Sequence, residues 1–199
     1  ILGDFIGVNP DSEMLVEQIR YPTKNNLYPQ VCRGWWEEQC LILHSLGATG
    51  EPTELIDKHG IDSTKQLWDA VSLETVQWLR NLDFGFVELD CLLIHGSSVS
   101  VSEELTPDTP PWQILDRLQR VGVNNLFCGR AGKVFDYSLQ SANLTSTVTT
   151  LDKRQPSQTL TIQDKRLIGV GSVAKELNKA VYTLYNPSNN CVEFRTVPY

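Results

Sequence analysis

Hydrophobic and polar positions recur with two different periods along the chain. Recurrence every three or four residues predicts helices over 11–20, 35–46, 62–70, 72–80 and 112–120. Short apolar runs predict strands near 1–2, 30–33, 84–88, 89–94 and 123–128. From Lys133 onward the period shortens to two, which predicts strands near 133–138, 145–151, 158–163, 166–170, 180–186 and 191–197. Residues 50–61 are rich in turn formers and are expected to connect two elements.

This order of elements favours a layered fold. Mixed βα units followed by an antiparallel run are typical of an α/β or α+β domain. The turn-rich segment 186–190 predicts a hairpin between the last two strands. The chain has 199 residues and shows no internal repeat, so we expect residues 1–199 to form a single domain.

Charge and composition narrow the classes of function. Lys and Arg number 17 against 24 Asp and Glu, which gives a net charge of −7. An acidic chain without a basic cluster is a poor nucleic-acid binder, because that affinity depends on neutralising phosphates. No apolar run is long enough to cross a bilayer. The five cysteines are scattered without a C-x-x-C, a pattern typical of buried free thiols in a cytoplasmic protein.

Candidate catalytic or ligand-binding residues lie at the ends of three predicted strands. His95 closes one apolar run, Asp4 follows Gly3 after another, and Arg130 follows Gly129 after a third. The ends of strands in α/β sheets are where ligands and metals bind. Each residue also has a structural alternative. His95 would then be a packed histidine, Asp4 would cap a turn, and Arg130 would form an ordinary salt bridge.

Four segments occur in an order that is informative: ILGDFIGVNPDSEMLVEQIR, LLIHGSS, LFCGRAGKVFDYSL and RLIGVGSVAKELNKAVYTLYNPSNNCVEFRTVPY. Together they resemble the motifs of the calcineurin-like metallophosphoesterases, in particular the branch of predicted phosphodiesterases. The resemblance runs from Ile1 to Tyr199 and implies a four-layer αββα sandwich of two mixed β-sheets flanked by helices. It also implies a βαβ segment with an Asp-x-His upstream of Ile1, so we expect the complete protein to have residues there.

The resemblance further implies two divalent metal ions, held about 3.5–4 Å apart, that clamp a phosphate ester. Asp4 matches the family's bridging carboxylate, and His95 matches its His-Gly ligand. The segment Gly34-Trp35-Trp36-Glu37 aligns with the Asn-His-Asp/Glu motif. Trp35 therefore replaces the Asn ligand, and Trp36 replaces the histidine that faces the phosphate.

This sequence also differs from the family's Gly-His-x-His segment, because Arg130 and Gly132 stand where the two histidines would be. Neither an indole nor a guanidinium offers a lone pair to a metal. We therefore expect no dinuclear centre, and either no metal or one weakly bound divalent ion of the Mn, Mg, Fe or Zn class at the remnant ligands Asp4 and His95.

The replaced positions suggest an anion-binding pocket formed by Trp35, Trp36, Gly129 and Arg130. The main hypothesis is a metallophosphoesterase-fold module that binds a phosphate-containing small molecule or nucleotide without hydrolysing it. A second hypothesis is an active metal-dependent phosphoesterase with a reduced or mononuclear site. A third is a protein-interaction subunit whose old cleft is filled by the two tryptophans. A protein partner or a homo-oligomer is compatible with each of these.

Overall fold

A mixed five-stranded sheet forms the centre of the molecule. The computed structural model describes residues 1–23, 28–47, 51–140, 142–146, 158–175 and 177–199. The strand order is β1-β2-β3-β7-β4, with bounds Gly85–Glu88, Cys91–Ile94, Asn125–Cys128, Lys165–Val170 and Val134–Leu139. The three central strands, β2, β3 and β7, are parallel, and both outer strands run antiparallel to their neighbours. The parallel strands therefore end at a common edge.

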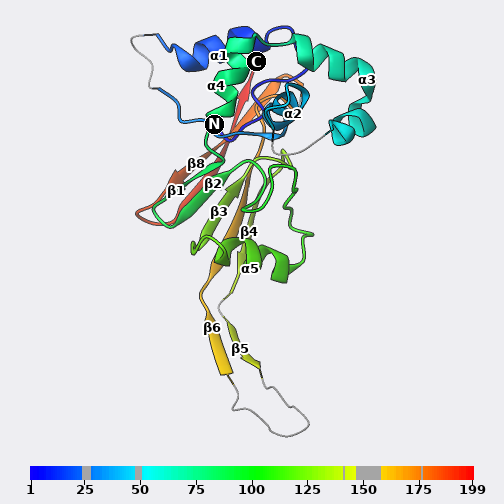
Figure 1. Cartoon of the computed structure of the whole chain (residues 1–199). Coiled ribbons are helices and arrows are strands. Elements are labelled where there is room, and N and C mark those ends of the chain that lie inside the picture. The colour runs from blue at the N-terminus through cyan, green and yellow to red at the C-terminus, as the bar shows by residue number, and fades with distance from the viewer. Residues whose placement is uncertain (24–27, 48–50, 141, 147–157, 176) are drawn as a thin grey trace, which may run out of the picture.

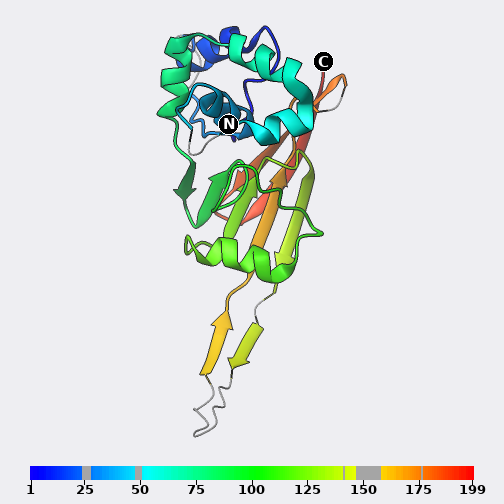
Figure 2. The ribbon, with the colours of Figure 1, turned by 45° about the vertical axis from the view of Figure 1, so that its right-hand side comes forward.

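The two faces of this sheet are covered by different elements (Figure 2). Helix α5 (Pro111–Gln119) buries Ile114 and Leu118 against one face, with Leu126 and Leu167 in the same cluster. The hairpin of β8 (Lys179–Asn186) and β9 (Cys191–Pro198) packs Tyr185 against Phe127 on the other face. Each fully buried Leu or Phe of this kind contributes roughly 1.5–3 kcal/mol. The predicted α/β fold with two sheets and helices is confirmed.

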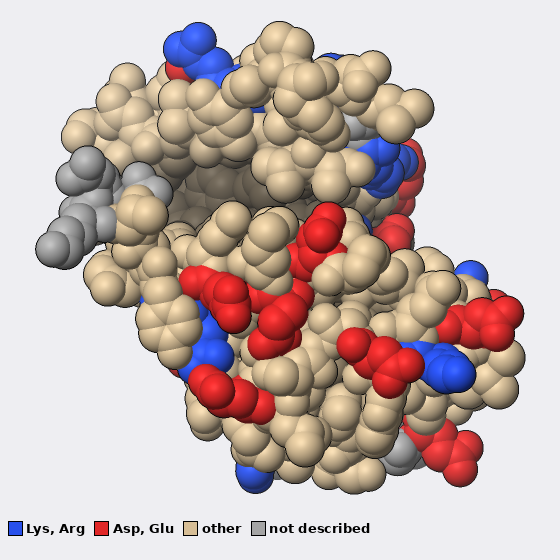
Figure 3. All heavy atoms as spheres, turned by 90° about the horizontal axis from the view of Figure 1, so that it is seen from above, with Lys and Arg blue, Asp and Glu red and all other residues tan. Residues whose placement is uncertain are grey.

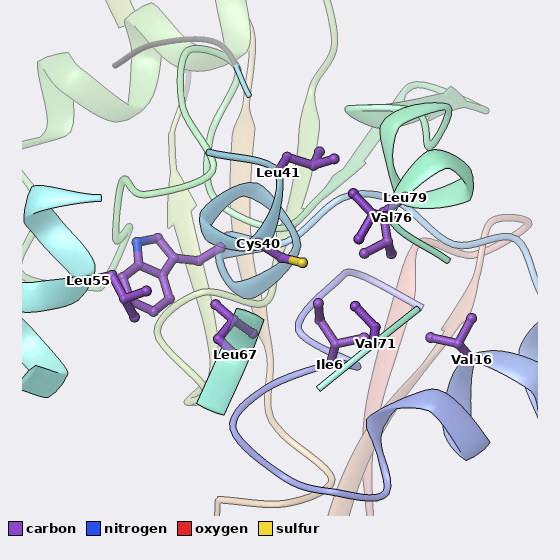
Figure 4. Close-up of a cluster of buried hydrophobic side chains, with 10 residues drawn as sticks. Ile6, Val16, Cys40, Leu41, Leu55, Leu67, Val71, Val76 and Leu79 are labelled. Atoms are coloured by element: carbon purple, nitrogen blue, oxygen red, sulfur yellow. The ribbon is translucent and has the colours of Figure 1, made fainter. Parts of the chain in front are cut away.

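Four helices gather beyond the carboxyl ends of the parallel strands (Figure 1): α1 (Ser12–Arg20), α2 (Trp35–Leu43), α3 (Thr53–Asp69) and α4 (Leu73–Arg80). They enclose a second hydrophobic core, in which Leu41 of α2 lies with Val16, Leu67 and Leu79 (Figure 4). Helix α4 begins where the Ser72 hydroxyl accepts a hydrogen bond from the Thr75 N–H, as an N-cap does. This helical layer holds the amino-terminal segment against the edge of the sheet.

Three local predictions are wrong. Residues 53–61 belong to α3, because Leu55 packs into the core and the helix kinks at Gly60 (φ 79°) instead of starting after it. Residues 1–2 form no strand; the Ile1 carbonyl accepts one hydrogen bond from the Cys32 N–H. In place of the strand expected near 30–33, Cys32 forms one isolated β-bridge with Asp83.

The remaining strands, β5 (Ala142–Ser146) and β6 (Gln158–Ile162), form a hairpin that projects from the end of the sheet opposite α1–α4 (Figure 1). Residues 147–151 of the strand expected over 145–151 lie outside the described residues. Within the described residues, none of the helices has both the length and the apolar character needed to cross a membrane. All five cysteines are free, and four are buried as expected, but Cys191 is exposed.

Candidate ligand-binding site

The residues that were expected after three strands, Asp4, His95 and Arg130, meet at the carboxyl edge of the sheet. The His95 carbonyl after β2 accepts hydrogen bonds from the N–H groups of Gly129 (2.8 Å) and Arg130 (2.7 Å) after β3. Asp4 joins them from the amino-terminal segment, with its Oδ2 3.2 Å from His95 Nε2 and 3.9 Å from Arg130 Nη1. Side chains from three separate parts of the sequence therefore form one constellation, as the sequence predicts.

The backbone of Asp4 has a positive φ, a conformation that few non-glycine residues adopt. Its φ is 55° and that of Gly3 is 76°, the left-handed region in which most side chains are strained. The Trp36 N–H donates to its Oδ1 at 2.9 Å. Burial by itself raises the pKa of Asp4, but His95, the Trp36 N–H and Arg130 together outweigh burial and leave the pKa below its usual value. Asp4 is therefore an ionised carboxylate that points into the site.

His95 is oriented by its other ring nitrogen. Its Nδ1 lies 2.6 Å from the Leu2 carbonyl, an acceptor, so Nδ1 carries a proton and donates it. The ring is almost fully buried, and Nε2 has no hydrogen-bond partner among the described residues although it faces Asp4. Nε2 and the Asp4 carboxylate oxygen thus lie 3.2 Å apart and face the same point. A proton or a cation between them would satisfy both groups.

Glu37 holds the loop that carries Asp4. Its fully buried carboxylate accepts hydrogen bonds from the N–H groups of Asp4 (2.8 Å), Phe5 (3.0 Å), Ile6 (3.0 Å) and Gly34 (2.8 Å). Burial and the nearby Asp4 charge raise the pKa of Glu37, while these donors favour the ionised form. Glu37 was not among the predicted site residues. The available signal was its place at the third position of a helix after a glycine N-cap, where a glutamate reaches back to backbone N–H groups.

Two glycines allow the Asp4 loop to approach α2 closely. A Cβ atom on Gly34 would lie 2.2 Å from the Asp4 nitrogen and 2.6 Å from its Oδ1. A Cβ atom on Gly3 would lie 2.4 Å from the Gly34 Cα. Neither position accepts a larger residue without moving Asp4, because real Cβ atoms do not approach other atoms so closely.

The two tryptophans occupy different environments. Trp35 is completely buried in the helical core, and Trp36 is half-buried on the wall of the cleft. Their rings pack edge to face at 4.8 Å, and His59 lies against both. The two side chains therefore do not jointly fill the cleft, which removes the premise of the third hypothesis. Among the described residues, the contact of Trp35 with the site runs through Arg130, whose guanidinium carbon lies 4.7 Å from its ring centre.

The described residues leave hydrogen-bond donors of Arg130 without an acceptor. Its Nε is buried without a hydrogen-bond partner, and its closest anionic contact in the described part of the chain is the 3.9 Å approach to Asp4. The Gly129 N–H, by contrast, is already bonded to His95, so that glycine offers no donor to an anion. A second cation, Lys175, lies on the wall of the cleft and donates to the Ala131 carbonyl at 2.7 Å. The pattern of the sequence had not singled out Lys175.

A cleft of about 1360 Å³ opens in front of these residues. Asp4, His95 and Arg130 lie on its wall, and the rest is lined largely by apolar side chains of α1, the sheet and β8. From above, the space-filling view shows a hollow at this helical end of the molecule, with acidic side chains gathered along one side of it (Figure 3). The volume suffices for a small organic ligand.

Solved structures identify the architecture. The chain is similar over its full length to a hypothetical protein, PH1004, from Pyrococcus horikoshii OT3, with a TM-score of 0.67, 20% identity and 74% of that chain covered. It is also similar over its full length to a metallophosphoesterase from Sphaerobacter thermophilus, with a TM-score of 0.59, 16% identity and 76% of that chain covered. The chain has a metallophosphoesterase fold. No protein-family model and no curated protein matches the sequence.

The residues at this site can be compared with the ligands that a divalent metal ion requires. Asp4 Oδ2 and His95 Nε2 fit as two ligands of one divalent ion, since the Nδ1 hydrogen bond fixes the ring in the way that metal-binding histidines require. Within the described residues, however, no three His, Cys, Asp or Glu side chains are grouped to hold a metal ion. The described residues therefore fit one ion with two side-chain ligands and water.

Proposed function

We propose that this metallophosphoesterase-fold protein binds a phosphate-containing small molecule at Arg130, beside Asp4 and His95, without a dinuclear metal centre. The observation that carries the proposal is the Arg130 guanidinium, which lies on the cleft wall with an unpartnered buried Nε. A guanidinium binds phosphate oxygens through paired, charge-assisted hydrogen bonds. The Trp35 ring, whose centre lies 4.7 Å from the guanidinium carbon, contacts Arg130 without using its N–H donors.

Electrostatics at the site favours an anion over a second cation. The Arg130 charge lies 3.9 Å from Oδ2 of Asp4, the residue that matches the family's bridging carboxylate. A unit charge repels a divalent ion by about 8 kcal/mol at 4 Å and an effective dielectric of 20. Lys175 adds a second positive charge to the cleft.

A mononuclear phosphoesterase is the second candidate function, and the geometry of Asp4 and His95 favours it. One divalent ion held by these two side chains would lower the pKa of its bound water and polarise a phosphoryl oxygen. Within that function Asp4 and His95 hold the ion, and Arg130 binds the phosphate group.

Titration calorimetry with inorganic phosphate and with a nucleoside monophosphate tests the binding proposal. Arg130→Ala should weaken binding about 10- to 100-fold, because hydrogen bonds to a charged group are worth roughly 1.5–3 kcal/mol. Arg166→Ala is the matched control, since Arg166 lies at the other end of the sheet and is paired with Asp136. Hydrolysis of bis-(p-nitrophenyl) phosphate with Mn²⁺, lost in Asp4→Asn, would establish the second function and overturn the first.

A further inference from the structure

The loop between β7 and β8 places Lys175 against the turn that carries Arg130. Lys175 Nζ donates a hydrogen bond to the Ala131 carbonyl at 2.7 Å. Ala131 and Arg130 are the central residues of a turn that is closed by a hydrogen bond from the Gly132 N–H to the Gly129 carbonyl (2.8 Å). Both cationic side chains line the same cleft. The ammonium and the guanidinium therefore lie at one short turn.

Gly132 leaves room for the Lys175 side chain. Its φ is 60°, in the left-handed region that favours glycine. A Cβ atom at this position would lie 2.9 Å from Lys175 Cδ and 3.1 Å from Lys175 Nζ. Lys175 thus occupies the space that a side chain at position 132 would enter. The location of the ammonium depends on this position remaining a glycine.

The loop that carries Lys175 is tied to strands on both sides. The Gly171 N–H donates to the carbonyl of Lys133, the residue before β4, at 3.2 Å. The Ser172 carbonyl accepts a hydrogen bond from the Val181 N–H of β8 at 3.0 Å. All of these contacts are made within the part of the chain that runs from β3 to β8. A donor that is held in place before binding loses less conformational entropy than a free lysine does.

Lys175 changes the charge balance of the site. Asp4 Oδ2 lies 3.9 Å from Arg130 Nη1, so the charges of these two residues nearly cancel. The Lys175 ammonium adds a positive charge, and the Ala131 carbonyl accepts one of its hydrogen bonds. An ammonium has three N–H donors, so two are left for a ligand. The site therefore combines a forked guanidinium with a compact ammonium.

We propose that Lys175 is the specificity-determining residue of the phosphate site and that the ligand is a phosphate monoester. This rests on the phosphate binding by Arg130 proposed above. A monoester has three free oxygens and a charge of about −1.5 to −2 at pH 7, because its second pKa is near 6. A diester has two free oxygens and a single charge. Arg130 binds two oxygens of either ligand, and Lys175 binds the third oxygen and the second charge, which distinguish the monoester.

Titration calorimetry with a matched pair of ligands tests this specificity. The pair is a nucleoside 5′-monophosphate and the same nucleotide with a methyl ester on its phosphate. Wild type should bind the monophosphate about 10- to 100-fold more tightly, since a hydrogen bond to a charged group changes affinity by that factor. Lys175→Met keeps the stem over Gly132 but removes the charge. It should remove most of this preference, whereas Arg130→Ala should weaken the binding of both ligands.

Two further variants separate the position of the charge from its presence. Gly132→Ala keeps every charge but displaces the Lys175 stem, so it should also reduce the preference for the monophosphate. Combined with Lys175→Met, it should change the preference no further. Lys133→Met is the matched control, because it removes the same charge from an exposed residue that does not line the cleft, and it should leave the preference intact. Thermal unfolding checks that each variant folds.

The outcomes distinguish this inference from the function on which it rests. A wild type that binds both ligands equally well overturns the inference and leaves phosphate binding in place. A preference that persists in Lys175→Met, or that falls equally in Lys133→Met, overturns it as well. A wild type that binds neither ligand overturns the proposed function, and the inference with it.

Discussion

Polar side chains lie at both ends of the parallel strands. At the amino ends they form hydrogen bonds with one another, and at the carboxyl ends some of their atoms have no partner among the described residues. At the amino ends, Asp90 accepts two hydrogen bonds from Asn124, and Lys165 donates to the Val123 carbonyl and to Asn124. Arg166 pairs with Asp136. At the carboxyl ends, His95 Nε2 and Arg130 Nε are buried without a hydrogen-bond partner among the described residues.

This difference separates a cluster that stabilises the fold from one arranged for a ligand. Both ends border a hollow, and the amino-end hollow is lined by Asp90, Asn124, Lys165 and Arg166. Among the described residues, buried side-chain atoms without a hydrogen-bond partner line the carboxyl-end hollow, and none lines the amino-end hollow. Unsatisfied buried groups cost about 1–3 kcal/mol each. A fold retains such groups where a ligand or a proton satisfies them.

The largest effect is expected from Glu37→Ala. It would leave two buried and two partly buried N–H groups without an acceptor and should lower the free energy of unfolding by about 3–5 kcal/mol. Arg166→Ala at the opposite end should cost about 1 kcal/mol or less, because its partners can turn to water. Urea denaturation measures both. Equal losses would show that the two ends do not differ in the way described.

A smaller, pH-dependent effect is expected from Asp4→Asn. The pKa of Asp4 lies below its ordinary value of 3.8 in the folded protein, so its charge stabilises the fold above that pH. That stabilisation is lost as the pH falls through the lowered pKa, whereas Asn carries no charge at any pH. The difference in unfolding free energy between wild type and Asp4→Asn should therefore shrink between pH 7 and pH 3. A constant difference would contradict the account of Asp4.

The smallest effect is expected from Gly129→Ala. Its Cβ would lie 3.2 Å from the Leu2 carbonyl oxygen and 3.7 Å from His95 Nδ1, contacts that small shifts can relieve. The loss should stay below about 1 kcal/mol in thermal unfolding, and phosphate binding should persist. Gly34→Ala is the contrasting variant, since it must displace Asp4. Loss of binding in Gly129→Ala alone would show that Gly129 contacts the ligand after all.

The sequence by itself determined the features that depend on local pattern and chain order. Period-two alternation located β4, β7, β8 and β9, and apolar runs ending in His95 and in Gly129-Arg130 marked the carboxyl ends of two strands. Parallel strands must end at a common edge, so the meeting of His95 with Arg130 could be predicted from their positions alone.

Only the tertiary structure decided which polar groups are satisfied and which are not. The partners of Glu37 lie mostly 31 to 33 residues away, and no local pattern specifies that separation. The adjacent Trp35 and Trp36 are alike in sequence, yet one is buried and the other lines the cleft, because α2 turns by 100° between them. Burial and hydrogen-bond partners depend on packing between distant segments, so the roles of Glu37 and the two tryptophans become visible only when the chain is folded.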